Sequence, residues 1–381
     1  MRRDSFLPVA RPDVTDAELA AAAEVLKSGW WTTGPKVIEF EEAMAQYLKE
    51  DEQLYAAGMN SCTAGLHLSL LALGIGRGDE VIVPTWTFAA TAQVVEWVGA
   101  TPVLCDIEED TLNIDPDRAE RLISGRTKAI IPVHIAGRPC DMDRLGALAG
   151  HYNLAVVEDA AHAMGSKYRN KRIGNFSDLT VFSFYATKNL AMGEGGLVIS
   201  KKRGLIERIR KLGYFGIKKD AFMRYEKAGT WLYDIEEIGY KYNLDSVHAA
   251  VGLAQLQRID IMNSRRRDIA RSYRENLNPA IWFTAVSEED LHSYHLFMIR
   301  VPGHIIGRDD LIAELKDRNI GTSVHFRPLH MHSYYGSRFP MEDFPVANRV
   351  FPEVLSIPMF PSMTEEDVEY VITNLNSLVE N

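Results

Sequence analysis

The stretch NLAVVEDAAHAMG, residues 153–165, places a short apolar run directly before two acidic residues and a segment of small residues. A run this short and this apolar is typical of a strand buried on both faces of a parallel sheet. Runs of the same kind lie on both sides of it: DEVIVPTWTF (79–88), ATPVLCDI (100–107), TKAIIPVHIAG (127–137), LTVFSFYATK (179–188) and GGLVIS (195–200). Segments with helical spacing of apolar residues separate them: AATAQVVEWVG (89–99), DPDRAERLISG (115–125) and DMDRLGALAGHYN (141–153). The alternation predicts an α/β fold with a largely parallel sheet.

The last third of the chain has a different pattern. Residues 245–276 read as one long helical stretch, and strands are expected at YHLFMIRV (294–301) and TSVHF (322–326), on either side of a helix at 308–319. A final helix at 364–381 begins with Thr364 and Asp367, which fit a variant of the capping box. These elements predict a smaller α+β domain. We therefore expect two domains, residues 1–245 and 246–381.

Composition narrows the class of protein. The 381 residues are 46% hydrophobic and 25% charged, which is the profile of a soluble globular protein. A net charge of −10 disfavours nonspecific binding to nucleic acid, and the basic run NSRRRDIARSYR (263–274) is interpreted as a solvated helix face. No apolar run approaches the ~20 residues that a membrane helix needs, and the start lacks the apolar core of a signal peptide. We expect a cytoplasmic protein with neither a nucleic acid nor a membrane as partner.

The three cysteines, Cys62, Cys105 and Cys140, form no CxxC pair and are odd in number. Neither a zinc knuckle nor a disulfide framework is therefore expected, and the thiols are interpreted as reduced.

Polar residues that end the apolar runs are the first candidates for a site, because ligands collect at the carboxyl ends of parallel strands. Asp159, His134 and Lys188 each follow such a run. Each also has a simpler interpretation. Asp159 could cap a helix, His134 could satisfy a backbone group at a strand end, and most lysines are simply solvated.

A second candidate is NSCTAGLHLSLLALG, residues 60–74, where small hydroxyl residues precede an apolar helical run. Ser61 or Thr63 could cap this helix, or its amide-rich N-terminus could hold a phosphate group. The glycines of GIGRGDE (74–80) fail as a dinucleotide fingerprint, because Asp79 takes the last glycine position and a strand follows. NAD binding is therefore disfavoured.

A phosphate cradle, an aspartate at a strand end and a lysine further along the chain are the parts that pyridoxal phosphate chemistry requires. The lysine forms a Schiff base with the cofactor, and the aspartate keeps the pyridine nitrogen protonated. Lys188 should then lie in a partly desolvated place that lowers its pKa, so that the free amine is available.

Six motifs together make the chain resemble a DegT/StrS-type sugar aminotransferase, a branch of the fold-type I pyridoxal phosphate enzymes. They are SGWWTTGPKVIEFE (28–41), residues 60–88, VEDAAHAMGS (157–166), FSFYATKNLAMGEGG (182–196), GYKYNLDSVHAAVGLAQL (239–256) and HFRPLH (325–330). The chain looks most similar to the members that aminate a nucleotide-linked 4-keto pentose for lipid A, a lipopolysaccharide component. The resemblance implies a large domain with a mainly parallel seven-stranded sheet, a smaller C-terminal domain, and a homodimer with shared sites.

The resemblance also implies roles for individual residues. Lys188 would be the Schiff-base lysine, Asp159 would pair with the pyridine nitrogen, and His162 would lie beside the cofactor ring. The remaining implied cofactor contacts are Thr63, Ala64 and Ser183 at the phosphate, Phe88 stacked on the ring, and Asn243 reaching the phosphate from the neighbouring subunit. The implied substrate-side residues are Trp31, Thr32, Thr33, His325 and Arg327.

Other interpretations of the same residues remain open at this point. Burial statistics alone place Phe88 and Trp86 in the core, and Asn243 could cap the helix that follows it. Cys62 departs from the alanine or glycine that is commoner in this phosphate loop, without excluding phosphate binding. Related dehydratases replace the Schiff-base lysine with histidine, so Lys188 argues against that activity.

The expected function is transfer of an amino group from an amino acid, with glutamate as the expected donor, to the keto group of a nucleotide-linked sugar. The product would be an amino sugar for a cell-surface glycan or lipid. No sequence feature separates glutamate from glutamine as donor. The alternatives are a catalytically silent binding or regulatory protein of the same fold and, more weakly, a metal protein built on His325, His330 and His332. That histidine set lacks a carboxylate and regular helical spacing, so no metal is expected.

Overall fold

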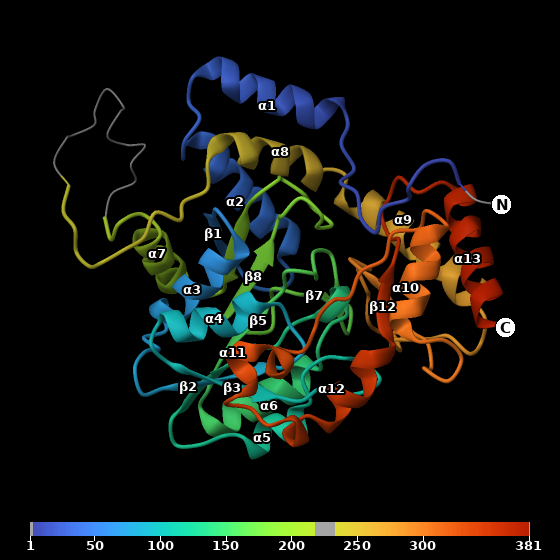
Figure 1. The fold of residues 1–381 in the computed structure, drawn as a ribbon. Coiled ribbons are helices and arrows are strands. Elements are labelled where there is room, and N and C mark those ends of the chain that lie inside the picture. The colour runs from blue at the N-terminus through green and yellow to red at the C-terminus, as the bar shows by residue number, and fades with distance from the viewer. Residues whose placement is uncertain (1–2, 218–232, 381) are drawn as a thin grey trace.

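The computed structural model describes residues 3–217 and 233–380. Its centre is a seven-stranded sheet with the order β1-β9-β8-β5-β4-β2-β3 (Figure 1). The strands are β1 (Tyr55–Met59), β2 (Glu80–Pro84), β3 (Thr101–Cys105), β4 (Thr127–Ile130), β5 (Ala155–Asp159), β8 (Leu179–Ser183) and β9 (Gly196–Ser200). Neighbouring strands from β3 to β8 pair in parallel, whereas β9 is antiparallel to both β8 and β1. The predicted α/β class and the mainly parallel seven-stranded sheet are confirmed.

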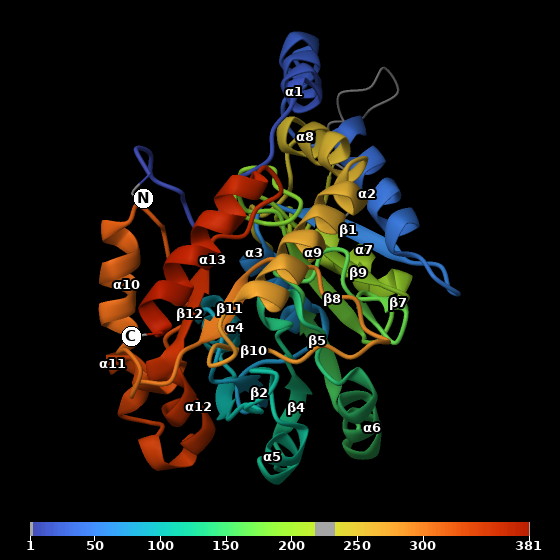
Figure 2. The ribbon, with the colours of Figure 1, turned by 90° about the vertical axis from the view of Figure 1, so that its right-hand side faces the viewer.

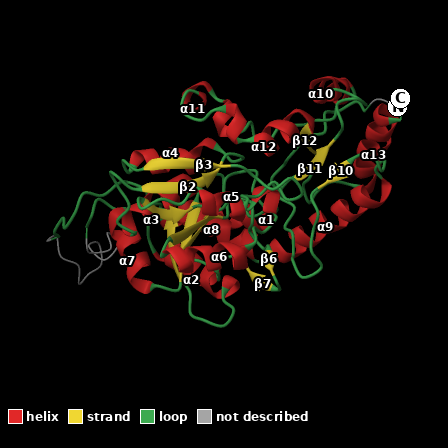
Figure 3. Ribbon diagram, turned by 90° about the horizontal axis from the view of Figure 1, so that it is seen from below, coloured by secondary structure: helices red, strands yellow, loops and turns green. Residues whose placement is uncertain are grey.

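Helices cover both faces of this sheet (Figure 3). One core contains α3 (Cys62–Ala72), α4 (Ala89–Trp97), α7 (Arg203–Leu212), α11 (Ser333–Gly336) and α12 (Pro345–Val350). The other contains α2 (Pro35–Leu48), α5 (Pro116–Arg121), α6 (Met142–Tyr152) and α8 (Ser246–Leu256). Successive residues of a strand serve opposite cores, as Val81 and Val83 do on one side of β2 and Ile82 on the other. This burial on both faces explains why the strands read as continuous apolar runs.

A three-stranded antiparallel sheet lies beside the large one, with the order β10-β11-β12 (Figure 2). Its strands are β10 (Trp282–Phe283), β11 (Phe297–Arg300) and β12 (Val354–Ile357), packed with α9 (Ile259–Asn276), α10 (Arg308–Asp317) and α13 (Glu365–Val379). Phe297 and Ile299 of β11 enter this third core, whereas Met298 between them joins a core of the large sheet. The small sheet is therefore packed on both of its faces. The division into domains at residues 245 and 246 stays a prediction.

The remaining elements lie at the periphery. Helix α1 (Asp16–Ser28) lies along α8, and the hairpin of β6 (Lys167–Tyr168) and β7 (Lys171–Arg172) follows β5 (Figures 1 and 2). Leu7, which precedes α1, pairs with Ile320 and is buried in the core of the small sheet. No helix of the described residues is long and apolar enough to span a membrane.

Two expected elements in the C-terminal part are wrong. The stretch 245–276 is two helices, α8 and α9, because the chain turns at Gln257 and Arg258, where Arg258 is held by ion pairs to Asp13 and Glu18. The strand expected at 322–326 is reduced to one bridge between Ser323 and Ser356, after which the chain leaves the small sheet. The capping box of Thr364 and Asp367 at the start of α13 is confirmed.

The basic run 263–274 is only partly a solvated face, because Arg266 of α9 is 2% exposed. Its guanidinium donates to the backbone carbonyls of Tyr294, His295 and Met359. Burial lowers the pKa of Arg266 to about 10. A cation that charge patterning assigns to solvent therefore joins α9 to two segments flanking the small sheet.

Gly196 fixes the position of α3 against the sheet. A Cβ atom at Gly196 would lie 2.4 Å from the carbonyl carbon of Ser61 and 2.6 Å from the amide nitrogen of Cys62. Both are backbone atoms, so neither can rotate away. The N-terminus of α3 can therefore lie close to the start of β9 only because residue 196 has no side chain.

We expect Gly196→Ala to lower the free energy of unfolding by about 1–3 kcal/mol, the usual cost of an overpacked site. Urea denaturation followed by circular dichroism measures the change. Gly204→Ala is the matched control, because no heavy atom of the described residues outside its own stretch of α7 lies within 4 Å of that Cβ position. Equal stability of the two variants would contradict the packing argument.

Candidate active site

Asp159 ends β5 at the carboxyl edge of the large sheet and is buried. Its Oδ2 accepts a hydrogen bond of 2.8 Å from the Thr91 hydroxyl, and its Oδ1 accepts one of 3.2 Å from the Ala161 amide. Burial raises the pKa of Asp159, while these two bonds and the nearby Lys188 act in the opposite direction. The carboxylate is thus held in a fixed orientation by donors on two different segments.

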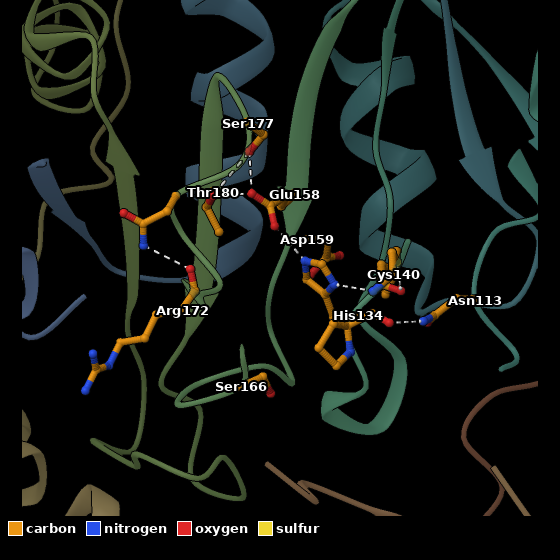
Figure 4. A network of polar contacts seen from close by, with 12 residues as sticks. Asn113, His134, Cys140, Glu158, Asp159, Ser166, Arg172, Ser177 and Thr180 are labelled. Carbon is orange, nitrogen blue, oxygen red and sulfur yellow. Dashed lines mark hydrogen bonds and ion pairs between the residues drawn. The ribbon is translucent and has the colours of Figure 1, made fainter. Parts of the chain in front are cut away.

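Glu158, the preceding residue, belongs to a different polar network (Figure 4). Its Oε2 lies 2.8 Å from His134 Nε2, and its Oε1 accepts hydrogen bonds from Ser177 and Thr180. His134 Nδ1 accepts from the Cys140 amide at 3.0 Å, so Nε2 carries the hydrogen and donates to Glu158. The simpler interpretation of His134, that it satisfies a backbone group, is confirmed, but this group is the Cys140 amide in the loop before α6 and not one at a strand end.

Lys188 lies in the loop that follows β8 and is half-buried. Its Nζ is 3.4 Å from His295 Nε2. Burial lowers the pKa of Lys188 to about 8, although the nearby Cys62 and Asp159 act to raise it. The next residue, Asn189, anchors the loop by donating to Asn263 Oδ1 at 2.7 Å and to the Ser293 carbonyl at 2.9 Å.

Aromatic rings line the same region. The rings of His162 and His295 have centroids 4.4 Å apart, and Phe326 stacks on His162 at 5.9 Å. Phe88 lies 5.6 Å from Phe326 and is 61% exposed, so the burial statistics that placed it in the core are wrong. They are right for Trp86, which is fully buried. Burial, followed by the charge of Lys188, holds the pKa of His162 well below its usual range, so the ring is neutral.

The start of α3 lies close to the end of β8. Ser61 is the helix cap, and its hydroxyl accepts from the Ala64 amide at 3.1 Å. The amide and hydroxyl of Thr63 have no hydrogen-bond partner among residues 3–217 and 233–380. Ser183 pairs with Gly196, the residue that contacts the Ser61 backbone, so Ser183 and the cap are neighbours. This helix end can therefore be capped and also bind a phosphate, because Ser61 caps it and the donors of Thr63 remain.

Trp31, Thr32, Thr33 and Asn243 form a separate cluster. The Asn243 amide donates to the Thr33 hydroxyl at 2.6 Å, and Ser246 binds the Thr32 carbonyl through its hydroxyl and the Trp31 carbonyl through its amide. A cavity of about 850 Å³ borders Thr33 and Asn243, and neither Lys188 nor Asp159 lines it. Asn243 does not cap α8, since Asp245 does so by accepting from the Val247 and His248 amides.

The histidines of residues 325–332 do not converge on one point. His325 bonds to Ser356, His330 to Thr85 and Asn348, and His332 to the Arg327 carbonyl. Burial, followed by the charge of Lys188, lowers the pKa of His325 to about 4, whereas Arg327 is exposed. The described part of the chain contains no group of three side chains that could hold a metal ion.

The sequence model of the DegT/DnrJ/EryC1/StrS aminotransferase family matches residues 12–376. The chain belongs to this family. Its members are pyridoxal phosphate-dependent sugar aminotransferases, and this protein is one of them. The resemblance to the family, the enzyme class and the cofactor expected from the sequence are therefore confirmed.

Individual relatives in the family match over the whole length. The spore coat polysaccharide biosynthesis protein SpsC of Bacillus subtilis is 44% identical, over 100% of this chain and 98% of SpsC. The putative sugar aminotransferase Spr1654 of Streptococcus pneumoniae, in its PMP form, is 35% identical with a TM-score of 0.91, over 98% of this chain and 99% of that one. DesV of S. venezuelae is 35% identical with a TM-score of 0.89, over 99% of each chain.

The residues at the strand ends fit the cofactor of the family. A buried carboxylate with one face held by Thr91 and Ala161 suits a protonated pyridine nitrogen, and a lysine with a lowered pKa suits bonding to an aldehyde. The open donors of Thr63 at a helix N-terminus suit a phosphate. The group would therefore be held by Asp159 at one end and by the start of α3 at the other.

Three residues of the site carry no assignment from the sequence. Thr91 is an ordinary member of a predicted helix, and only the fold brings its hydroxyl to Asp159. Phe326 lies between His325 and Arg327, which the resemblance assigns to the site, so the motif could have pointed to it. His295 is the second residue of the predicted strand 294–301, where a polar residue facing the core was a weaker signal.

We expect the cofactor-free Lys188→Met variant to be more stable than the wild-type protein at pH 7, by about 1–2 kcal/mol after allowance for partial exposure. The unfolded amine binds a proton up to pH 10.5, but the folded amine only up to about pH 8. The wild-type protein therefore gains stability between these values, and the advantage of the variant should disappear over the same range.

Urea denaturation at several pH values from 7 to 10.5 tests this. Lys171→Met is the control, because Lys171 is exposed and paired with Asp51, which raises its pKa. Two results would contradict a desolvated amine. One is a Lys188→Met variant that is less stable than the wild type, and the other is a stability advantage of the variant that is the same at every pH.

Proposed function

We propose that the protein transfers an amino group from an amino acid, with glutamate as donor, to the keto group of a nucleotide-linked sugar. The sugar is proposed to be a 4-keto sugar, as in the 4-keto pentose enzymes that the sequence resembles. The single observation that carries the proposal is the half-buried Lys188, with its lowered pKa, within electrostatic range of the buried Asp159. A catalytically silent protein has no need to keep a lysine where its charge is disfavoured.

Asp159 and Lys188 have different tasks in this proposal. When bound, pyridoxal phosphate supplies an electron sink for the electrons released at the carbon that bears the amino group. Asp159, oriented by Thr91, holds the proton on the pyridine nitrogen. Lys188, as a free amine, takes the proton from the substrate carbon and returns it during the second half of the reaction. Its pKa near 8 is suited to both directions of transfer near neutral pH.

The other cofactor contacts are proposed from the family pattern and supported by the geometry. Thr63 and Ser183, and Ala64 through an amide that it shares with the Ser61 hydroxyl, would hold the phosphate near the start of α3, where the helix dipole also favours an anion. Phe88 would cover one face of the ring, and its exposure leaves that face free for contact. His162 is neutral and lies between Phe326 and His295, so it offers a flat ring beside the cofactor without adding charge.

The nucleotide-linked sugar would be bound by Trp31, Thr32, Thr33, His325 and Arg327. A protein of net charge −10 must attract a diphosphate with local donors, and the exposed guanidinium of Arg327 is one. Relatives named for spore coat polysaccharide and pseudoaminic acid biosynthesis support a cell-surface glycan or lipid, such as lipopolysaccharide, as the destination. The three unpaired thiols support a cytoplasmic location.

We further propose a homodimer whose sites are shared, with Asn243 serving the phosphate of the neighbouring subunit. Among the described residues, the side chain of Asn243 hydrogen-bonds to Thr33, Lys241 and the Leu244 carbonyl, and not to Asp159 or Lys188. Large apolar side chains near this cluster are exposed, including Trp31, Ile235 and Ile238. A second copy would cover them.

We expect the Lys188→Ala variant to lose at least about 100-fold in turnover, because it lacks the group that moves the proton. The assay supplies glutamate and a panel of nucleotide-linked keto sugars and detects the amino sugar by mass spectrometry. Lys171→Ala, at an exposed lysine, is the control and should keep full activity. Transamination by the Lys188→Ala variant would overturn the proposed role of Lys188. Amination of free keto acids, but of no nucleotide-linked sugar, by the wild-type protein would overturn the proposed substrate class.

The shared site is tested by mixing Lys188→Ala subunits with Asn243→Ala subunits. Each pure variant should be defective, with Asn243→Ala losing ~1.5–3 kcal/mol of cofactor affinity, the worth of a hydrogen bond to a charged group. In a mixed dimer one site collects both defects and the other has neither, so cofactor affinity at that site should return to the wild-type value. Differently tagged subunits show that mixed dimers form. No recovery in such dimers would mean that Asn243 acts within its own chain.

A further inference from the structure

His295 is the closest polar neighbour of Lys188 among the described contacts, yet nothing proposed above uses it. Its Nε2 lies 3.4 Å from Lys188 Nζ, and the side chain is only 4% exposed. Its other nitrogen, Nδ1, is buried without a hydrogen-bond partner in the described part of the chain. A buried imidazole with one unpaired nitrogen is costly, so its position needs a reason other than packing.

The segment that carries His295 is held firmly from several sides. Asn189, next to Lys188 in sequence, donates to the Ser293 carbonyl at 2.9 Å. The Ser293 hydroxyl donates to the His162 carbonyl at 3.0 Å. Arg266 of α9 donates to the His295 carbonyl. The imidazole is thereby fixed relative to both the lysine loop and the turn after β5.

The charges around His295 decide which partner donates. Lys188 faces it from the loop after β8, His162 from the turn after β5, Arg266 from α9 and His325 from the segment after α10. Burial first, and then these cationic or neutral groups, hold the pKa of His295 well below its usual range. The imidazole is therefore neutral at pH 7 while the amine of Lys188, with its pKa near 8, is protonated. The hydrogen bond then runs from Nζ to Nε2, and Nδ1 carries the unpaired N–H.

We propose that His295 is a positioning residue for Lys188, which accepts a hydrogen bond from the lysine amine and holds it beside Asp159 whenever that amine is free. This inference rests on the role proposed above for Lys188. A lysine that is released once in every catalytic cycle has four rotatable bonds, and an acceptor fixed by three other elements limits where its amine goes. The unpaired Nδ1 lowers the stability of the protein, whereas Nε2 is placed to hold the amine of Lys188.

The test measures the pKa of Lys188 in the cofactor-free protein. Competitive labelling with acetic anhydride from pH 6 to 11, read by mass spectrometry on the peptide that contains Lys188, gives this value beside those of the surface lysines. The variants are His295→Leu and His295→Asn, which have no acceptor within reach, and His295→Gln, whose amide oxygen can reach the position of Nε2. His292→Leu is the matched control, because His292 is also buried and, within the described part of the chain, accepts a hydrogen bond at Nδ1 from the Tyr294 amide.

Loss of an acceptor from the charged amine should lower the pKa of Lys188 by about one unit or more in His295→Leu and His295→Asn. His295→Gln should keep it near the wild-type value, and His292→Leu should not move it. Should His295→Leu fail to fold, the difference between the Asn and Gln variants decides. An unchanged pKa in folded His295→Asn, or an equal shift in His292→Leu, would overturn the inference.

The same measurement separates this inference from the proposed function. A wild-type Lys188 that titrates together with the surface lysines would overturn the role of Lys188 and this inference with it. A wild-type pKa near 8 that does not respond to His295 would overturn the inference alone.

Discussion

The burial of Asp159, together with the partial burial of Lys188, is the constraint on which the rest of the site depends. The charged form of each side chain is more stable in solvent, and burial is the main cause that shifts each pKa from its ordinary value. The polar groups around them follow from this. Thr91 and Ala161 donate to the buried carboxylate. Burial, followed by the charge of Lys188, keeps His295 and His162 neutral, so neither adds a second cation beside the lysine.

The adjacency of Glu158 and Asp159 shows how strictly the strand register is set. Both are buried carboxylates of β5, but Glu158 serves the His134 network while Asp159 serves the site. Side chains alternate between the two faces of a strand, so a register shift of one residue would turn Glu158 and Asp159 each to the opposite face. Glu158 would then lack the donors of Ser177 and Thr180, and the site would lack its carboxylate. The apolar neighbours Val156 and Val157 belong to opposite cores and impose the same register.

The fold was largely predictable from the sequence, and the site only in part. Strands buried on both faces leave continuous apolar runs, and their carboxyl ends point to Asp159 and Lys188 without any knowledge of pairing. Thr91 was not predictable, because only the fold brings its hydroxyl to Asp159. His295 was signalled only weakly, because it is 107 residues from Lys188 in the chain and no local pattern marks their contact. Arg266 shows the opposite failure. Its sequence neighbours are exposed cations, and only the carbonyls of distant segments explain its burial.

The described residues of the small sheet pack directly against a core of the large one. Met298 of β11 and Val354 of β12 enter a core of the large sheet, while Phe297 and Leu355 beside them enter the small core. A hinge rotation that carried the small sheet outward would tear this shared apolar layer open, at about 25 cal/mol for each Å² exposed. Rigid swinging of one half against the other is therefore mechanically disfavoured.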